Sequence, residues 1–156
     1  KKRNNIQMNG YYWREFKIII RRVFRRVRIL VGLDLNYNFD GFSIFLPPDH
    51  LLPLFQKEHL MHERIIPLIA KKLNPVDLVI DIGANCVDTM ALMHEKNQKL
   101  SYVCVEPDSY FMSYLKKNID KLKQVGKPVD VVCVQALIGK VVNTAFLTGR
   151  GGLKNF

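Results

Sequence analysis

Apolar positions in residues 11–31 recur with the period of an α-helix. The apolar side chains fall on one face and the arginines and lysines mostly on the other, which predicts a basic amphipathic helix. Two interpretations stay open. Such a helix can lie on an anionic membrane, or it can pack on its own domain or a partner and leave its arginines in water. The apolar face consists of Phe16, Ile19, Ile20, Val23, Phe24, Val27, Leu30 and Val31.

The hydrophobic period changes to two in residues 33–46, where apolar and polar side chains alternate. Asp40 and Gly41 interrupt the alternation, and an Asp-Gly pair between two alternating runs is typical of a tight hairpin turn. Pro47 and Pro48 then end the second run. The segment therefore predicts a β-hairpin, and nothing in it points to chemistry.

Residues 50–73 return to a helical pattern, which ends at Asn74. Pro67 is expected to start, kink or end a helix within this segment. His59 and His62 are three positions apart and could share a helix face. Their spacing matches neither the HExxH nor the HxxEH zinc pattern, so we expect no metal site.

From residue 76 onward, continuous apolar runs alternate with helical patterns. Such runs predict buried strands, and strands that alternate with helices predict right-handed βαβ units and a parallel sheet. The fold class expected is α/β: a Rossmann-like parallel sheet preceded by a basic amphipathic helix and a β-hairpin. Residues 141–148 predict a further strand, after which no element is expected. The expected strands are 76–82, 101–106 and 129–137, and the expected helices are 88–96 and 107–125.

Three segments follow from these patterns: the basic helix at 1–32, the hairpin and helical lead-in at 33–75, and the partial Rossmann-like domain at 76–156. The net charge of +10 is concentrated in the first of them, because residues 1–28 contain ten Lys/Arg and only one acidic residue. The remaining chain is nearly neutral, which argues against a nucleic-acid-binding face on the domain.

The three cysteines, Cys86, Cys104 and Cys133, all lie in apolar runs without CxxC spacing. They are expected to be buried and reduced, which favours an intracellular protein without disulfides or a zinc site. No apolar run reaches the length that crosses a bilayer. We therefore expect a cytoplasmic protein, with peripheral contact to the inner face of the membrane through residues 1–31.

The stretch VIDIGANCVDT, residues 79–89, carries the strongest chemical signal. Asp81 ends a strand, Gly83 lets the backbone turn, and the N–H groups that open the next helix can face an anion. Glu106 ends the next strand, where an acid can bind both hydroxyls of a ribose. Two interpretations stay open: a nucleoside site, or two acids that only cap the turns that follow them.

This stretch, together with YVCVEPDSYFMSYLKKNI and VVCVQALIG, resembles the FkbM family of S-adenosylmethionine-dependent methyltransferases. The family pattern is DxGANxG, then EPxxxxxxxLxxNI, then a strand that ends near Ala-Leu-Gly. The similarity covers about residues 76–148, and the upstream hairpin also resembles the lead-in of bacterial members. The resemblance implies S-adenosylmethionine as the cofactor. By position, Asp81, Gly83, Ala84 and Asn85 would line its methionine end, Glu106 would bind its ribose, and Pro107, Asp108, Gln135 and Ala136 would border its adenine.

The resemblance implies O-methylation of a sugar hydroxyl in a polysaccharide, other glycan or natural product, without naming a catalytic base. Two departures bear on it. Val87 stands where the family has its second glycine, and a segment resembling DxxKxDxEGxE is missing. We therefore expect weak cofactor binding, an open sheet edge at the first strand, and no methyltransferase activity from the chain as given. The alternative is a non-catalytic, membrane-associated protein that retains a nucleoside-binding half-fold.

Overall fold

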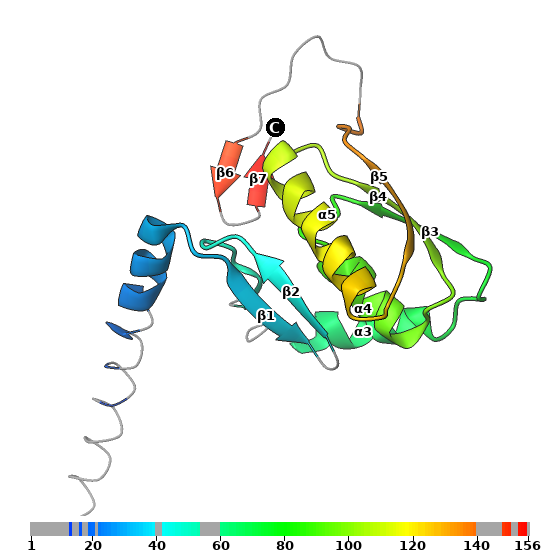
Figure 1. Ribbon diagram of the computed structural model, residues 1–156, viewed down its shortest axis with the longest axis horizontal. Helices are drawn as coiled ribbons and strands as arrows, with labels where there is room; N and C mark the ends of the chain where they lie inside the picture. Colours follow the sequence, from blue (N-terminus) through cyan, green and yellow to red (C-terminus); the bar gives the residue numbers. More distant parts are fainter. Residues whose placement is uncertain are drawn as a thin grey trace, which may run out of the picture. The chain divides into compact units, whose positions relative to one another are not determined.

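The computed structural model describes residues 13, 16, 19–20, 22–39, 42–53, 60–139, 148–150 and 153–155 (Figure 1). The chain divides into two compact units, residues 1–34 and 35–156. In the first unit residues 22–31 are helical, which confirms this part of the expected amphipathic helix. No helix in the described part of the chain is long and apolar enough to cross a membrane.

The second unit begins with the expected hairpin, formed by β1 (Leu35–Phe39) and β2 (Phe42–Leu46). The strands pair antiparallel, with Phe39 opposite Phe42, so a two-residue connection joins them. That connection, Asp40-Gly41, lies outside the described residues. The apolar side of β2 faces the core, where Ile44 and Leu46 are fully buried.

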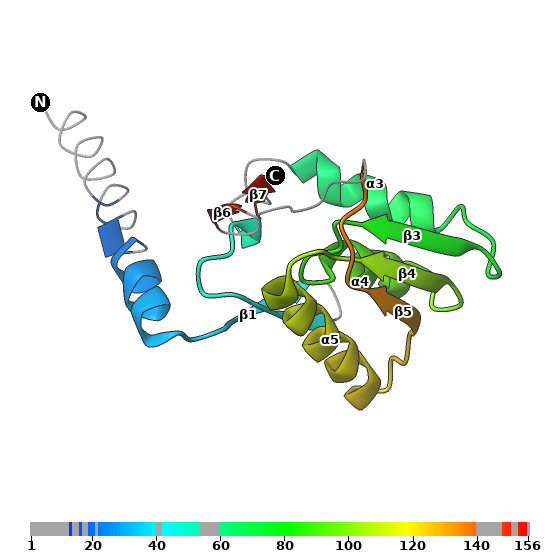
Figure 2. The same cartoon turned by 90° about the horizontal axis from the view of Figure 1, so that it is seen from above.

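A three-stranded parallel sheet forms the centre of the second unit, in the order β3-β4-β5. Its strands are β3 (Leu78–Ile82), β4 (Ser101–Val105) and β5 (Asp130–Val134). The crossover helices α4 (Asp88–Lys96) and α5 (Ser109–Gln124) both lie on one side of the sheet, as Figures 1 and 2 show. This arrangement confirms the expected α/β fold class and places β3 at an edge of the described sheet.

The expectation that all three strands are buried on both faces is wrong. Alternate side chains of β3 and β5 are exposed, because both crossover helices cover the same face. On the opposite face the side chains of Leu78, Ile80 and Ile82 are 57–63% exposed, and Val132 is 59% exposed. A continuous apolar run therefore correctly predicted strands with two apolar faces, although only one of these faces is covered within the described residues.

The lead-in contains α3 (Leu60–Ala70), which packs against α4. Pro67 lies inside this helix, which continues to Ala70, so the proline neither starts nor ends it. The expectation that residues 149–156 contain no element is also wrong. Short strands β6 (Thr148–Arg150) and β7 (Leu153–Asn155) form a separate antiparallel pair. Most of the expected strand at 141–148 lies outside the described residues.

The side chain of Asn118 in α5 joins three parts of the second unit. Its Oδ1 accepts a hydrogen bond of 2.7 Å from the N–H of Phe45 in β2, and its Nδ2 donates to the carbonyl of the same residue at 2.9 Å. The amide nitrogen also donates to the carbonyl of Cys86, in the turn after β3, at 2.8 Å. Asn118 is fully buried. A single amide thus fixes the hairpin and the turn to the same helix.

Replacement of Asn118 by leucine should strongly destabilise the protein. Leucine is similar in size but leaves three buried backbone groups without partners, and each such group costs about 1–3 kcal/mol. We expect a loss of roughly 3–5 kcal/mol in the free energy of unfolding, measured by urea denaturation. Gln124→Leu is the matched control, because it makes the same kind of change at an exposed position of α5. Equal effects of the two substitutions would contradict the role assigned to Asn118.

Candidate functional site

The turn after β3 is pinned to the end of β4 by its own backbone. The N–H groups of Gly83 and Ala84 both donate to the carbonyl of Val105, at 2.8 and 3.1 Å. Gly83 has φ +81°, which a glycine adopts without strain. The turn therefore forms as expected at the carboxyl ends of two neighbouring parallel strands, where α/β proteins bind their ligands.

The turn continues through two non-glycine residues in left-handed conformations. Asn85 has φ +49°, and Val87, which caps the N-terminus of α4, has φ +85° and ψ 10°. Asparagine tolerates this region, but a β-branched residue there is strained. The valine at this position therefore does not prevent a positive φ. The backbone keeps the conformation that favours glycine, and Val87 carries the strain while its side chain is fully buried in the core.

Glu106 follows β4 and holds the turn from the other side. Its Oε2 accepts from the N–H of Asn85 and its Oε1 from the N–H of Asp108, both at 2.9 Å. Asp108 in turn caps α5 by accepting from the N–H of Tyr110 at 2.8 Å. Glu106 is buried. The capping interpretation thus fits Glu106, whose carboxylate can still accept further bonds because it offers about four lone-pair positions.

His50 is the residue of this region that sequence reasoning missed. The N–H of Leu52 donates to its Nδ1 at 3.1 Å, so Nε2 carries the proton and donates to Oδ1 of Asn85 at 3.1 Å. Burial lowers the pKa of His50, against the opposing effects of the Asn85 hydrogen bond and of Asp88. The imidazole therefore orients the Asn85 side chain. No spacing rule could have found His50, because it lies 35 residues from Asn85 in the sequence.

Asp81 in β3 differs from the other two acids because it caps nothing. Its Oδ2 is buried without a hydrogen-bond partner in the part of the chain that the structure describes. Burial, together with the charges of Asp88 and Glu106, raises the pKa of Asp81 to about 6. An orphaned carboxylate oxygen at the carboxyl end of a parallel strand is suited to a ligand that brings a hydrogen-bond donor or a positive charge.

The remaining residues expected to contact the cofactor follow the ends of the same strands. Pro107 lies between Glu106 and the α5 cap, and Gln135 and Ala136 come directly after β5. The N–H of Glu106 donates to the carbonyl of Val134 at 3.1 Å, so these two segments are adjacent. All nine residues predicted to bind the cofactor therefore lie at or near the carboxyl ends of the three parallel strands. The side chain of Gln135 is exposed and that of Ala136 is half-buried.

His94 and two of the three cysteines lie in the interior of the second unit. His94 of α4 is buried beside the ring of Tyr102, with 6.3 Å between the ring centroids. His59 lies outside the described residues. Two cysteines are buried as expected, whereas Cys133 is half-buried. Within the described ranges, no three His, Cys, Asp or Glu side chains are grouped to hold a metal ion.

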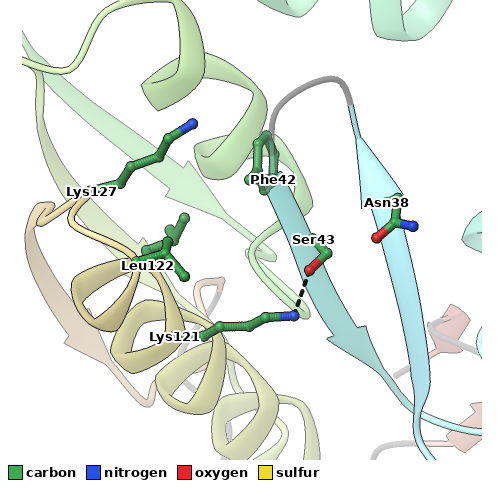
Figure 3. A pocket seen from close by; sticks show the side chains of 7 residues that line it. Asn38, Phe42, Ser43, Lys121, Leu122 and Lys127 are labelled. Atoms are coloured by element: carbon green, nitrogen blue, oxygen red, sulfur yellow. Dashed lines mark hydrogen bonds between the residues drawn. The ribbon is translucent and has the colours of Figure 1, made fainter.

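Two hollows of the second unit lie between the hairpin and α5. Figure 3 shows one of about 390 Å³, in which Lys121 donates to Oγ of Ser43 at 2.7 Å. The other, of about 600 Å³, is lined by Phe45 and by lysines of α5. The Nζ of Lys121 lies 4.0 Å from the centroid of the Phe45 ring. Neither hollow includes a residue of the strand ends, so they are separate from the candidate site.

The strain at Val87 predicts that glycine is more stabilising than alanine at this position, which is the opposite of their order inside a helix. Val87→Gly and Val87→Ala both remove the buried methyl groups, but only alanine keeps the Cβ that is strained at φ +85°. We expect Val87→Gly to be more stable than Val87→Ala by about 1 kcal/mol, measured by urea denaturation. In the helical interior of α4 the order reverses, so Ala91→Gly should cost about 1 kcal/mol. An alanine variant at residue 87 as stable as the glycine variant would contradict the strain.

The raised pKa of Asp81 predicts how stability depends on pH. The pKa of this carboxyl is about 6 in the folded protein and lower in the unfolded chain. Its contribution to stability is therefore complete at pH values below the pKa of the unfolded chain. The contribution is lost as the pH rises through 6. Asp81→Asn removes the dependence. Between pH 4 and pH 7, the stability of the wild type should fall by roughly 2–3 kcal/mol relative to Asp81→Asn. Asp120→Asn, at an exposed position of α5, is the control, and a wild-type profile parallel to that of Asp81→Asn would refute the prediction.

The sequence matches no protein-family model, and no curated protein matches it. Solved structures with a similar fold include the N-terminal domain of human METTL16 in complex with SAH, at 23% identity and a TM-score of 0.38, over 60% of this chain and 37% of that one. A human methyltransferase 10 domain containing protein is 19% identical with a TM-score of 0.39, over 74% and 52% of the two chains. A protein-L-isoaspartate O-methyltransferase is 20% identical with a TM-score of 0.32, over 66% and 29%.

This chain thus spans between about a third and a half of the lengths of these structures. The similarity concerns the fold alone, and the FkbM assignment gains no support from it. With its three-stranded parallel sheet, two crossover helices and antiparallel hairpin, the chain is an α/β protein with the Rossmann-like arrangement expected from the sequence.

Proposed function

We propose that this chain carries the cofactor-binding half of an FkbM-type methyltransferase and binds S-adenosylmethionine at the carboxyl edge of its sheet. The observation that carries the proposal is the orphaned Oδ2 of Asp81, because a buried carboxylate oxygen without a partner is costly unless a ligand completes it. The methionine end of the cofactor has an ammonium group that fits this need. The residues present therefore fit the cofactor at the point where the fold has an unmet requirement.

The other residues have matching roles in this proposal. Glu106, at the end of β4, accepts from ribose hydroxyls while it keeps its bonds to the turn. Asn85, oriented by His50, sets the backbone of the turn beside the methionine end. Pro107, Asp108, Gln135 and Ala136 border the adenine. The cofactor supplies a methyl group on a sulfonium, and a sugar hydroxyl is the acceptor that the family resemblance favours.

A non-catalytic protein that keeps the half-fold is the second candidate function. One observation favours it: the N–H groups of Gly83, Ala84, Asn85 and Val87 all donate to acceptors of the chain itself. A turn whose donors are already used offers fewer hydrogen bonds to a ligand, and Val87 adds strain to the same segment. Both candidate functions are compatible with the same fold. The measurement that distinguishes them is whether the chain binds S-adenosylmethionine.

Calorimetry with S-adenosylmethionine and the full chain separates the two candidates. We expect binding that strengthens from pH 5 to pH 7.5, since Asp81 ionises near pH 6 and the ionised form attracts an ammonium group. Asp81→Asn should weaken binding by about tenfold or more at pH 7.5 and remove the pH dependence. Glu106→Gln should also weaken it, because an amide nitrogen cannot accept from a ribose hydroxyl.

Glu95→Gln is the matched control for the loss of an acid. Glu95 lies near the C-terminal end of α4 and pairs with Lys127 at 2.6 Å, so its replacement should leave cofactor binding unchanged. Absence of binding by the wild type at every pH would reject the proposal in favour of the non-catalytic candidate. Binding that is equal in the wild type, Asp81→Asn and Glu106→Gln would show that the cofactor binds elsewhere.

A further inference from the structure

The helix at residues 22–31 in the first unit exposes two chemically different faces. We propose that it docks on an anionic membrane surface, with its apolar face in the boundary between headgroups and acyl chains and its arginines on the lipid phosphates. This inference concerns the first unit alone and does not depend on cofactor binding. It rests on the exposure of the helix, on the distribution of its charges and on the chemistry of the partners that could cover it.

The apolar face of the helix is broad and uncovered. Phe24 is 72% and Leu30 is 85% exposed, and Val23 and Val27 lie on the same face at about 50% exposure. A helix turns by about 100° per residue, so these positions form one stripe. Towards the N-terminus the described side chains of Trp13, Phe16 and Ile20 extend the stripe, and all of them are exposed. Exposed apolar stripes of this kind mark interaction surfaces.

The opposite face carries only positive charge. Arg22, Arg25, Arg26 and Arg28 lie along it, and the sequence contains no acidic residue from position 16 to position 33. Ile29 is the one apolar residue that the helical period places among these arginines. Any partner that covers the apolar stripe therefore also meets a dense field of arginine side chains at the edges of the stripe.

Charge complementarity decides between the partners. A second copy of the chain would bring its own net charge of +10 against the same arginines. Residues 35–156 contain 14 Lys/Arg and 12 Asp/Glu, so the rest of the chain offers no excess of negative charge. A nucleic acid offers phosphates but no apolar layer beneath them. An anionic bilayer offers both, since phosphates lie directly above hydrocarbon.

The helix suits a position on the membrane surface because its exposed apolar stripe and its arginines lie on different faces. An in-plane amphipathic helix inserts its apolar face by about 5–10 Å, while long arginine side chains reach the headgroups. Each arginine near the surface contributes enough attraction to change binding by about fivefold. Four arginines in seven positions therefore make binding strongly dependent on lipid charge.

Co-sedimentation of the full chain with vesicles tests the proposal. The vesicles contain phosphatidylcholine alone or an equal mixture with phosphatidylglycerol, at about 50 mM and about 500 mM salt, where the Debye length differs about threefold. We expect binding to the mixed vesicles at low salt and a loss of about tenfold or more at high salt. Binding to phosphatidylcholine alone should be at least tenfold weaker.

Ile29 and Leu30 are neighbours of equal size on different faces of the helix, so they provide a matched pair of variants. Leu30→Ser removes an apolar side chain from the stripe, whereas Ile29→Ser removes one from the arginine face. Leu30→Ser should weaken binding to mixed vesicles by about fivefold or more, and Ile29→Ser should leave it within about twofold. Arg25→Gln with Arg26→Gln should lower binding by about twentyfold and reduce the effect of salt. Urea denaturation of each variant checks that the second unit remains folded.

The outcomes decide the proposal in either direction. Binding that follows lipid charge, salt and the Leu30/Ile29 pair supports it. No vesicle binding by the wild type, or equal binding to both kinds of vesicle, overturns it in favour of a helix packed on its own chain. Salt-dependent binding to RNA without binding to vesicles assigns the arginines to nucleic acid. Self-association that Leu30→Ser abolishes, without vesicle binding, assigns the stripe to a second copy and likewise overturns the proposal.

Discussion

The amide of Asn118 is the constraint on which the rest of the second unit depends. A buried asparagine must satisfy both its carbonyl and its NH2 group, and this one does so with Phe45 on one side and Cys86 on the other. These directional hydrogen bonds fix one arrangement of the hairpin, α5 and the turn after β3. Apolar contacts alone would allow the three segments to shift against one another. Cys86 lies between the two left-handed residues of the turn, so the same amide also holds the strained backbone in place.

The turn at residues 83–87 has a strained backbone at Val87, and the N–H groups of Gly83, Ala84, Asn85 and Val87 all donate within the chain. Its conformation is the one that a glycine would favour at residue 87, although valine occupies the position and its side chain fills the core. Burial of these methyl groups stabilises the fold by an amount similar to the cost of the torsion, so the two effects oppose each other at one residue. The surrounding hydrogen bonds to Val105 and Glu106 maintain the torsion. Strain of this kind persists only where neighbouring contacts determine the backbone.

The sequence predicted the strands, the crossover helices and the hairpin, because each has a clear period or a turn signal. It also predicted that Asp81, Gly83 and Glu106 lie together, since the ends of parallel strands share an edge. Three features could not be predicted. Exposure of one face of β3 depends on which face the helices cover, and apolar runs do not record this. His50 reaches Asn85 only through the fold. The backbone at Val87 follows from contacts of its neighbours, against the preference of valine itself.

β3 is an edge strand in the described sheet and also carries Asp81, so the open edge and the candidate site belong to one strand. A strand that paired with the open side of β3 would restrict its fluctuations and so reduce the entropy lost when a ligand orders the turn. The coupling between two binding events is reciprocal. A ligand at Asp81 would therefore tighten the association of the added strand by the same factor by which that strand tightens the ligand. Under the proposed function, the open edge of β3 and the candidate site would therefore be thermodynamically coupled.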